Sequence, residues 1–344
     1  MKALVKDNKE RGFIYKEIEY PSLGDNDVLI KVKAAAICGT DLLFYEWGKA
    51  ADVIVQKLPF IPGHECAGVV EDKGRNVTRF KKGDHVSVDT HIPCGTCFQC
   101  RNGMMHICKN LLLFGHHVDG CFAEFAKAPS VSVRRIPDIL PFEMGALLEP
   151  MGISLRGVLA GDVAGESVVV IGCGPVGLFI VGLSKYFGAS RIIAADINAN
   201  RLSVAERMGA TRIINVTEED EIEAVISLTD GDGAGVIIEA SGSSEAFNRS
   251  FKYLRKGGKL ILVGNAKEEL KISNPLADLM HKEITMRAFH GREMYATWEK
   301  AESILLSGRF DVSPLITHRY KLSEFEKGFE ACLSGEACKV IFTF

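Results

Sequence analysis

The stretch Val168–Asp196 reads VVVIGCGPVGLFIVGLSKYFGASRIIAAD, and it decides the fold of the second half of the chain. It opens with a continuous apolar run, which is typical of a strand buried on both faces of a parallel sheet. A glycine-rich turn, a helical stretch to about residue 187 and a second apolar run follow. This order of strand, turn, helix and strand predicts a βαβ unit.

The turn of that unit carries the pattern GxGxxG at Gly172, Gly174 and Gly177. The first glycine permits a tight turn, the second lets the backbone approach a pyrophosphate, and the third lets helix and strand pack closely. We expect the new helix, with Val176 in its first turn, to attract phosphates through its N-terminal amides. The alternative is that the glycines serve packing alone. Their place between a strand and a helix favours a dinucleotide site.

The acidic residue that ends the next strand, Asp196, lies 19 residues after Gly177. A carboxylate at this place accepts hydrogen bonds from the adenosine ribose and repels a 2′-phosphate, so NAD is expected rather than NADP. Arg201 is expected to stack on the adenine, with phosphate binding as a less favoured role.

The same alternation continues through the residues that follow, with further apolar runs at 213–215, 235–239, 259–264 and 283–289. Strands that alternate with helices predict an α/β fold with a doubly wound parallel sheet. Residues 1–150 instead show short alternating segments and turns, which indicate a mostly-β domain. Residues 291–344 are too few to form a domain, so we expect them to pack back on the first one.

The composition is that of an ordinary globular protein, with 47% hydrophobic and 25% charged residues and a net charge of −3. This balance argues against nucleic acid and against an anionic membrane as partners. The N-terminal residues contain no signal-peptide core, and no apolar run reaches about 18 residues. A cytoplasmic protein is therefore expected.

Four of the ten cysteines are crowded into one short segment, with the spacing Cys94-x2-Cys97-x2-Cys100-x7-Cys108. Clustered cysteines in a chain without an export signal indicate a metal site rather than disulfides. Four thiolates without a free position suit a closed structural zinc. An iron–sulfur cluster is the competing interpretation.

A second candidate metal site combines Cys38 with the neighbours His64 and Glu65, and Glu149 offers another carboxylate. Sulfur, imidazole and carboxylate together are a catalytic zinc set that leaves one position open. A zinc there stabilises an alkoxide and lowers the pKa of an alcohol, whose hydride then leaves for a nicotinamide. Each residue alone has a structural explanation, so the hypothesis depends on the combination.

Five motifs carry a resemblance over essentially the whole chain: Cys38–Asp41, Gly63–Gly68, the four-cysteine lobe, Leu148–Pro150 and Gly172–Gly177. With these the chain resembles the zinc-containing medium-chain alcohol dehydrogenases. The resemblance implies a GroES-like catalytic domain at 1–150 with a zinc lobe at about 90–112. It also implies a Rossmann NAD-binding domain at 151–290, a return of residues 291–344 to the catalytic domain, and a cleft between the two domains.

The resemblance also assigns roles to single residues. It places Cys38, His64, Glu65 and Glu149 around the catalytic zinc, with the two glutamates exchanging in and out of its shell. It implies that Thr40 passes the alcohol proton toward the nicotinamide ribose. Two zinc ions per subunit and a homotetramer built partly through the edge of the Rossmann sheet are further implications. The cofactor contacts it implies beyond the glycine-rich turn are Val263, Gly264, Phe289 and His290.

Within that family the chain is most similar to the threonine dehydrogenases, on the stretches 45–47, 89–94, 291–298 and 314–319. These enzymes oxidise a secondary alcohol, the threonine β-hydroxyl, to give 2-amino-3-oxobutanoate. The substrate carboxylate would need a cation or amides, for which His91, Arg156 and Arg292 are candidates, although a surface or interface charge is the favoured explanation for each of them. His116 and His117 follow the zinc lobe, and either is a candidate to face the cleft.

Two departures from the threonine dehydrogenases keep other functions open. Threonine dehydrogenases carry a histidine three residues after the relay threonine, where this chain has Leu43. They also carry a Gly-Asn-Ala run one residue after Glu-Pro, where this chain has Gly152, Ile153 and Ser154. Leucine cannot pass a proton. A polyol, cyclitol or sugar alcohol, as in sorbitol or galactitol-phosphate dehydrogenases, is therefore the alternative substrate. A non-catalytic scaffold is the alternative from another class, and the retained metal set argues against it.

Overall fold

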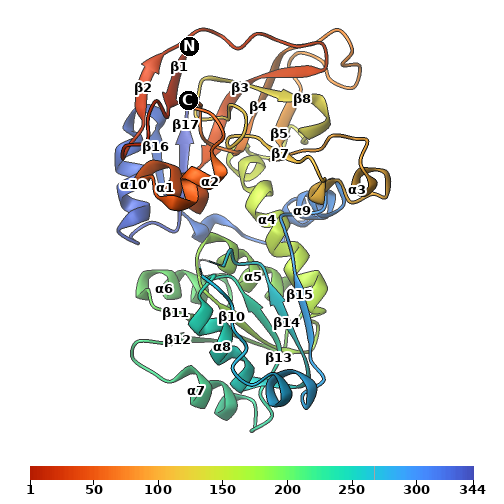
Figure 1. Ribbon diagram of the computed structural model, residues 1–344, viewed down its shortest axis with the longest axis vertical. Coiled ribbons are helices and arrows are strands. Elements are labelled where there is room, and N and C mark those ends of the chain that lie inside the picture. Colours follow the sequence, from red (N-terminus) through yellow and green to blue (C-terminus); the bar gives the residue numbers. More distant parts are fainter. Residues whose placement is uncertain (267) are drawn as a thin grey trace. The chain divides into compact units, whose positions relative to one another are not determined.

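A computed structural model describes residues 1–266 and 268–344, and the chain divides into two compact units (Figure 1). The first unit consists of Met1–Glu149, Glu293–Glu302 and Ile316–Phe344, and the second of Pro150–Arg292 and Ser303–Leu315. Two helices, α4 (Phe142–Gly161) and α9 (Ala296–Leu306), each begin in the first unit and end in the second.

One segment near the C-terminus departs from the expectation that all of residues 291–344 return to the first domain. Ser303–Leu315 groups with the second unit. The reason is local packing: the Phe310 ring lies against Gly182, and the Arg309 guanidinium donates a hydrogen bond to the Tyr186 hydroxyl. Neither contact has a signature in the sequence pattern.

The second unit is built on a six-stranded sheet in which every neighbouring pair is parallel, in the order β12-β11-β10-β13-β14-β15. The chain starts at the central β10, runs outward on one side and then returns to run outward on the other. The adjacent β10 and β13 therefore form a topological switch point, beyond whose carboxyl ends ligands bind. The strands are β10 (Ser167–Ile171), β11 (Arg191–Asp196), β12 (Arg212–Asn215), β13 (Ala234–Glu239), β14 (Leu254–Leu262) and β15 (Thr285–Ala288).

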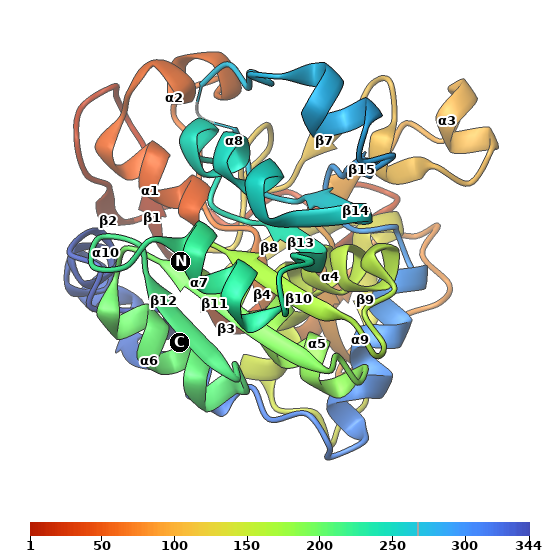
Figure 2. The same cartoon turned by 90° about the horizontal axis from the view of Figure 1, so that it is seen from below.

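Helices cover both faces of this sheet, which explains why its central strands are apolar without alternation. Figure 2 shows α5 and α6 on one side of the sheet and α8 on the other. Val170 contacts the α5 side, whereas Val169 and Ile171 pack with Phe247 and Phe251 of α8. The helical segments of the unit are α5 (Pro175–Tyr186), α6 (Ala199–Met208), α7 (Glu221–Leu228), α8 (Ser244–Tyr253), η3 (Leu276–Met280) and η4 (Ser313–Leu315).

The first unit is mostly β, as the short alternating segments predict. Its main sheet has the order β16-β17-β3-β4-β5-β9, with β8 also paired to β3, and two small sheets pair β1 with β2 and β6 with β7. The strands are β1 (Lys2–Val5), β2 (Ile14–Glu17), β3 (Asp27–Ala36), β4 (Glu65–Lys73), β5 (His85–Val88), β6 (His91–Ile92), β7 (Leu112–Leu113), β8 (Phe125–Pro129), β9 (Val133–Arg135), β16 (Ile316–Lys321) and β17 (Lys339–Thr343). The helical segments are α1 (Gly39–Glu46), α2 (Lys49–Ile54), α3 (Phe98–Arg101), η1 (Met105–Ile107), η2 (Ser130–Ser132), η5 (Leu322–Glu324) and α10 (Phe325–Leu333).

The C-terminal strand β17 is central to this unit because it pairs antiparallel with β3, with Ile341 opposite Ala36. Phe342 on β17 and Phe329 on α10 enter the same buried cluster as Phe122. The end of β3, the start of β4 and the start of β17 consequently meet, since Glu65 also lies opposite Ala36. Among the described residues, no helix is long and apolar enough to cross a membrane.

Candidate active site and metal centres

Three donors from two neighbouring segments of the first unit converge on one point. Cys38 is the N-cap of α1, two residues after the end of β3; His64 immediately precedes β4, and Glu65 is the first residue of that strand. Because Glu65 pairs with Ala36, the sheet register brings both segments together. One ligand atom from each of the three residues lies within 4.8 Å of the other two. Sulfur, nitrogen and oxygen donors at this spacing suit a zinc ion with an open coordination position.

Asp41 ties these two segments to each other. Its side chain is completely buried and accepts hydrogen bonds from the backbone amides of Cys38, at 2.9 Å, and Gly63, at 3.2 Å. Asp41 belongs to the Cys38–Asp41 motif, and this contact is a role that the motif alone does not reveal. Its place at the third position of a helix after a polar N-cap is the signal that predicts such a contact.

Lys339 places a buried cation beside the metal ligands and is a residue that sequence reasoning missed. Its Nζ lies 2.5 Å from Glu65 Oε2 and donates a hydrogen bond of 2.9 Å to the Ile37 carbonyl. Both side chains of the ion pair are essentially inaccessible to solvent. Lys339 lies beside Glu65 because β17 pairs with β3, and no sequence motif predicts that pairing.

Glu149 lies in α4 immediately before Pro150 and is buried. Its Oε1 accepts a hydrogen bond of 2.5 Å from the Thr90 hydroxyl, so a residue on the loop after β5 orients it. Glu149 is outside the group of three converging donors. Burial is the main cause that raises the pKa of Glu65, and the nearby charge of Glu149 raises it further. Thr40 is half-buried, with its hydroxyl 4.0 Å from Cys38 Sγ.

The electrostatics of the site fit a divalent cation. Burial by itself lowers the pKa of His64, but Cys38 and Asp41 raise it well above its usual range. Burial likewise lowers the pKa of Lys339, whereas Glu65 and Cys38 raise it overall. Both pKa values are raised by the anionic donors around these groups, and a site of such negative potential attracts a metal ion.

The four-cysteine lobe forms a second, closed cluster. Cys94, Cys97, Cys100 and Cys108 bring their sulfurs within 4.8 Å of one another, and Cys97 Sγ lies 3.5 Å from Cys100 Sγ and 3.7 Å from Cys108 Sγ. Sulfurs bound to one tetrahedral zinc at about 2.3 Å stand about 3.8 Å apart. Backbone and side-chain hydrogen bonds from Thr96 lower the pKa of Cys94 to about 5, which favours the thiolate that binds metal. The geometry therefore fits a structural zinc.

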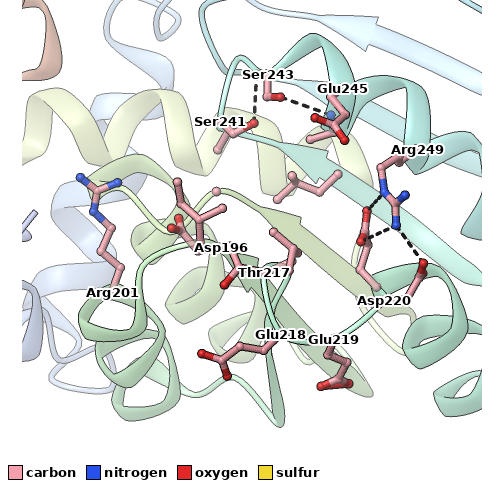
Figure 3. A pocket seen from close by; sticks show the side chains of 18 of the residues that line it. Asp196, Arg201, Thr217, Glu218, Glu219, Asp220, Ser241, Ser243, Glu245 and Arg249 are labelled. Carbon is pink, nitrogen blue, oxygen red and sulfur yellow. Dashed lines mark hydrogen bonds and ion pairs between the residues drawn. The ribbon is translucent and has the colours of Figure 1, made fainter.

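The second unit contains a pocket of about 830 Å³ at the switch point of its sheet (Figure 3). Gly172 and Gly174 line it, and α5 begins with Pro175 directly after them. Glycine is required in this turn, because a Cβ on Gly177 would lie 1.8 Å from the Gly172 carbonyl oxygen. The pocket therefore combines a glycine-rich turn with a helix N-terminus, the arrangement that binds a pyrophosphate.

The predicted adenosine contacts lie at one end of this pocket, where Figure 3 shows Asp196 and Arg201. Asp196 is buried, and its carboxylate accepts hydrogen bonds from the backbone amides of Cys173, at 2.5 Å, and Asn198, at 2.8 Å. The glycine-rich turn thus fixes the position of the Asp196 carboxylate through the Cys173 amide. Val176 is half-buried, and its carbonyl oxygen accepts the hydroxyl of Ser154.

The four remaining predicted cofactor residues follow two adjacent strands. Val263 and Gly264 come after β14, and both of their amides donate to the Glu239 carbonyl of β13. Phe289 and His290 come after β15, and Arg156 Nη1 donates to the His290 carbonyl at 3.2 Å. The pocket lining does not include these four residues. The structure places them after the carboxyl ends of neighbouring parallel strands, and their contact with a cofactor stays a prediction.

An open sulfur–nitrogen–oxygen site and a closed four-thiol site on a mostly-β unit, joined in one chain to a dinucleotide-binding sheet, define a zinc-dependent dehydrogenase. Residues 24–138 match the family model of the alcohol dehydrogenase GroES-like domain, and residues 175–307 match that of the zinc-binding dehydrogenases. The predicted combination of a GroES-like and a Rossmann domain is confirmed. The chain is an enzyme that acts on alcohols with zinc and a nicotinamide cofactor.

Full-length relatives lead to the same family. L-threonine 3-dehydrogenase of Bacillus licheniformis is 41% identical over 99% of this chain and 98% of its own. Among solved structures, the alcohol dehydrogenase TADH from Thermus sp. ATN1 matches with a TM-score of 0.91 and 31% identity over 100% of this chain and 99% of its own. The 2R,3R-butanediol dehydrogenase from Bacillus subtilis matches with a TM-score of 0.89 and 26% identity, again over 100% and 99%. The chain belongs to the zinc-containing medium-chain alcohol dehydrogenase family.

Proposed function

We propose that this enzyme oxidises the β-hydroxyl of L-threonine with NAD, giving 2-amino-3-oxobutanoate, NADH and a proton. The observation that carries the proposal is the convergence of Cys38, His64 and Glu65 in a chain 41% identical over its length to an L-threonine 3-dehydrogenase. The stretch 291–298 carries the most specific part of the resemblance to the threonine dehydrogenases.

The ligands of the catalytic zinc are proposed to be Cys38, His64 and the carboxylates of Glu65 and Glu149. A bound zinc supplies a Lewis acid that lowers the pKa of the substrate hydroxyl. Lys339 balances the charge of Glu65, and Thr90 holds Glu149 by its Oε1. Thr40 is proposed to receive the alcohol proton, with its hydroxyl near the Cys38 sulfur.

The preference for NAD over NADP is supported by the charges around the adenosine end of the pocket. Among the described residues, the lining of the whole pocket holds two arginines, Arg201 and Arg249, against six acidic residues: Asp196, Glu218, Glu219, Asp220, Glu221 and Glu245. Arg249 is engaged by Glu221 and Asp220, as Figure 3 shows for Asp220. A 2′-phosphate would meet net negative charge and one arginine, whereas the ribose hydroxyls of NAD find acceptors.

Two zinc ions per subunit are proposed, one in each cluster. Metal analysis of the purified protein tests this directly. About two zinc ions per chain in the wild type support both sites, and one zinc ion per chain in a Cys38 variant shows that the lobe holds the other. A Cys38 variant that retains no zinc contradicts the structural site in the lobe.

A polyol, cyclitol or sugar-alcohol dehydrogenase is the second candidate, and Leu43 favours it. The residue is in α1 and 43% exposed, and its side chain cannot carry the proton that a histidine would carry there. An NADH-formation screen over threonine, serine, sorbitol, galactitol, inositols and butane-2,3-diol separates the two. Turnover of threonine with the highest kcat/KM supports the first proposal, and activity on a polyol with none on threonine overturns it.

A homotetramer in the cytoplasm is proposed as the working form. The edge strand β15 supports assembly, because all four of its residues are exposed, whereas the central strands β10, β11 and β13 are almost wholly buried. All ten cysteines are free, as a reducing compartment requires. Light scattering coupled to size exclusion tests the subunit number, and a monomer at micromolar concentration contradicts it.

A further inference from the structure

His116 lies beside a zinc ligand, in the loop that follows β7, and the mechanism above does not use it. It is 8% exposed, and its ring meets the Phe44 ring edge to face at 5.1 Å between centroids. It also meets the His64 ring edge to face, at 4.6 Å and 85°. The closest polar contact between the two imidazoles is 3.2 Å, from His116 Nε2 to His64 Nδ1.

This contact indicates which nitrogen of His64 is turned toward protein neighbours rather than toward the proposed metal position. Nδ1 of His64 faces His116 Nε2 and, at 3.7 Å, Asp41 Oδ1. The aspartate distance is beyond the usual hydrogen-bond range of about 2.7–3.2 Å. The Asp41 oxygens also accept the amides of Cys38 and Gly63, and Asp41 is a second, more distant neighbour of this nitrogen. His116 therefore offers the nearer acceptor, and Nε2 of His64 is left for the metal.

We propose that His116 is a positioning residue for the zinc ligand His64, whose Nδ1–H it accepts at Nε2. A histidine that binds metal through one nitrogen carries its proton on the other, and the partner of that N–H fixes the tautomer and the ring orientation. The opposite arrangement, in which His116 donates, would leave the proton of His64 on Nε2 and prevent metal binding there. The inference rests on the catalytic zinc of the proposed function.

The surroundings of His116 suit this role as an acceptor. The imidazole packs against Phe44, which itself packs against Phe60, so the ring lies among apolar neighbours and is held as the neutral form. A neutral ring that accepts at Nε2 carries its proton on Nδ1, and this buried N–H has no acceptor among the described residues, a desolvation cost that zinc binding at His64 has to offset. Zinc binding thus selects one tautomer of each of the two histidines.

Three variants test the proposal by zinc affinity rather than by activity. His116→Leu removes the acceptor, His116→Gln keeps an acceptor oxygen at a similar reach, and His117→Leu changes the neighbour that does not contact His64. Zinc is withdrawn by a chelator series, and the catalytic site is identified as the zinc that the Cys38→Ser variant lacks. His116→Leu is expected to weaken this zinc by about 10–100-fold, with His116→Gln within threefold of wild type and His117→Leu unchanged.

Wild-type affinity in a folded His116→Leu variant that keeps its lobe zinc overturns the inference. If that variant does not fold, the native protein decides instead, through long-range ¹⁵N–¹H spectra of ¹⁵N-histidine-labelled, zinc-loaded enzyme. A protonated Nδ1 on His64 with an unprotonated Nε2 on His116 supports it, and a protonated Nε2 on His116 overturns it. Absence of zinc at Cys38 in the wild type would be a failure of the proposed function, which this series separates from failure of the inference.

Discussion

Replacing Lys339 with methionine leaves the Glu65 carboxylate buried without its cation. Nζ of Lys339 lies 2.5 Å from Glu65 Oε2, and neither side chain is more than 1% exposed. Removing one partner of such a buried ion pair costs about 3–5 kcal/mol, because the remaining charge stays desolvated. At about 2–4 °C per kcal/mol for a unit of this size, Lys339→Met is expected to lower Tm by about 6–20 °C.

Two control variants accompany Lys339→Met: one removes the Glu65 charge as well, and one breaks an exposed ion pair. Glu65→Gln in the Lys339→Met background removes the stranded charge and is expected to recover much of the loss. Lys82 forms an exposed pair with Glu71 at 2.6 Å, with the lysine side chain 72% exposed, so Lys82→Met is expected to leave Tm almost unchanged.

Differential scanning calorimetry of metal-free and zinc-loaded protein is the assay. The loss of Tm is expected to be larger without metal, because a bound divalent ion supplies a second positive charge near Glu65. A Tm within about 2 °C of wild type for metal-free Lys339→Met would refute the reasoning. Equal losses for Lys339→Met and Lys82→Met would refute it as well.

Three further substitutions test the two sites. Cys38→Ser is expected to remove about one zinc per chain and abolish turnover while leaving the fold intact by circular dichroism, since the sulfur is a proposed ligand; loss of folded structure in step with activity contradicts this. Asp196→Ala is expected to relax the preference for NAD, measured as the ratio of kcat/KM for NAD and NADP, because the repelling carboxylate is gone; an unaltered ratio counts against the assignment. Gly177→Ala is expected to abolish tight NADH binding in a fluorescence titration, because its Cβ would lie 1.8 Å from the Gly172 carbonyl oxygen. Wild-type binding by that variant would show that the turn accommodates a side chain.

Much of the fold follows from local sequence. The run from Val168 to Asp196 carries strand, turn, helix and strand within 29 residues, and the structure forms them in that order. The cysteine lobe is equally local, because turns and two short helical segments, α3 and η1, suffice to gather its four sulfurs. Sequence patterns over such short distances report the structure directly, since backbone geometry limits where the side chains can lie.

The pairing of distant segments escapes such patterns. Sequence alone identified Cys38, His64 and Glu65 as a candidate set and predicted a mostly-β domain before a parallel α/β domain. Only the tertiary structure shows that Lys339 neutralises Glu65, since this depends on β17 lying beside β3. The partners of His64 depend in the same way on a loop folding back over α1. Local patterns record which faces of a strand or helix are apolar, whereas the choice of neighbour is made by packing over the whole unit.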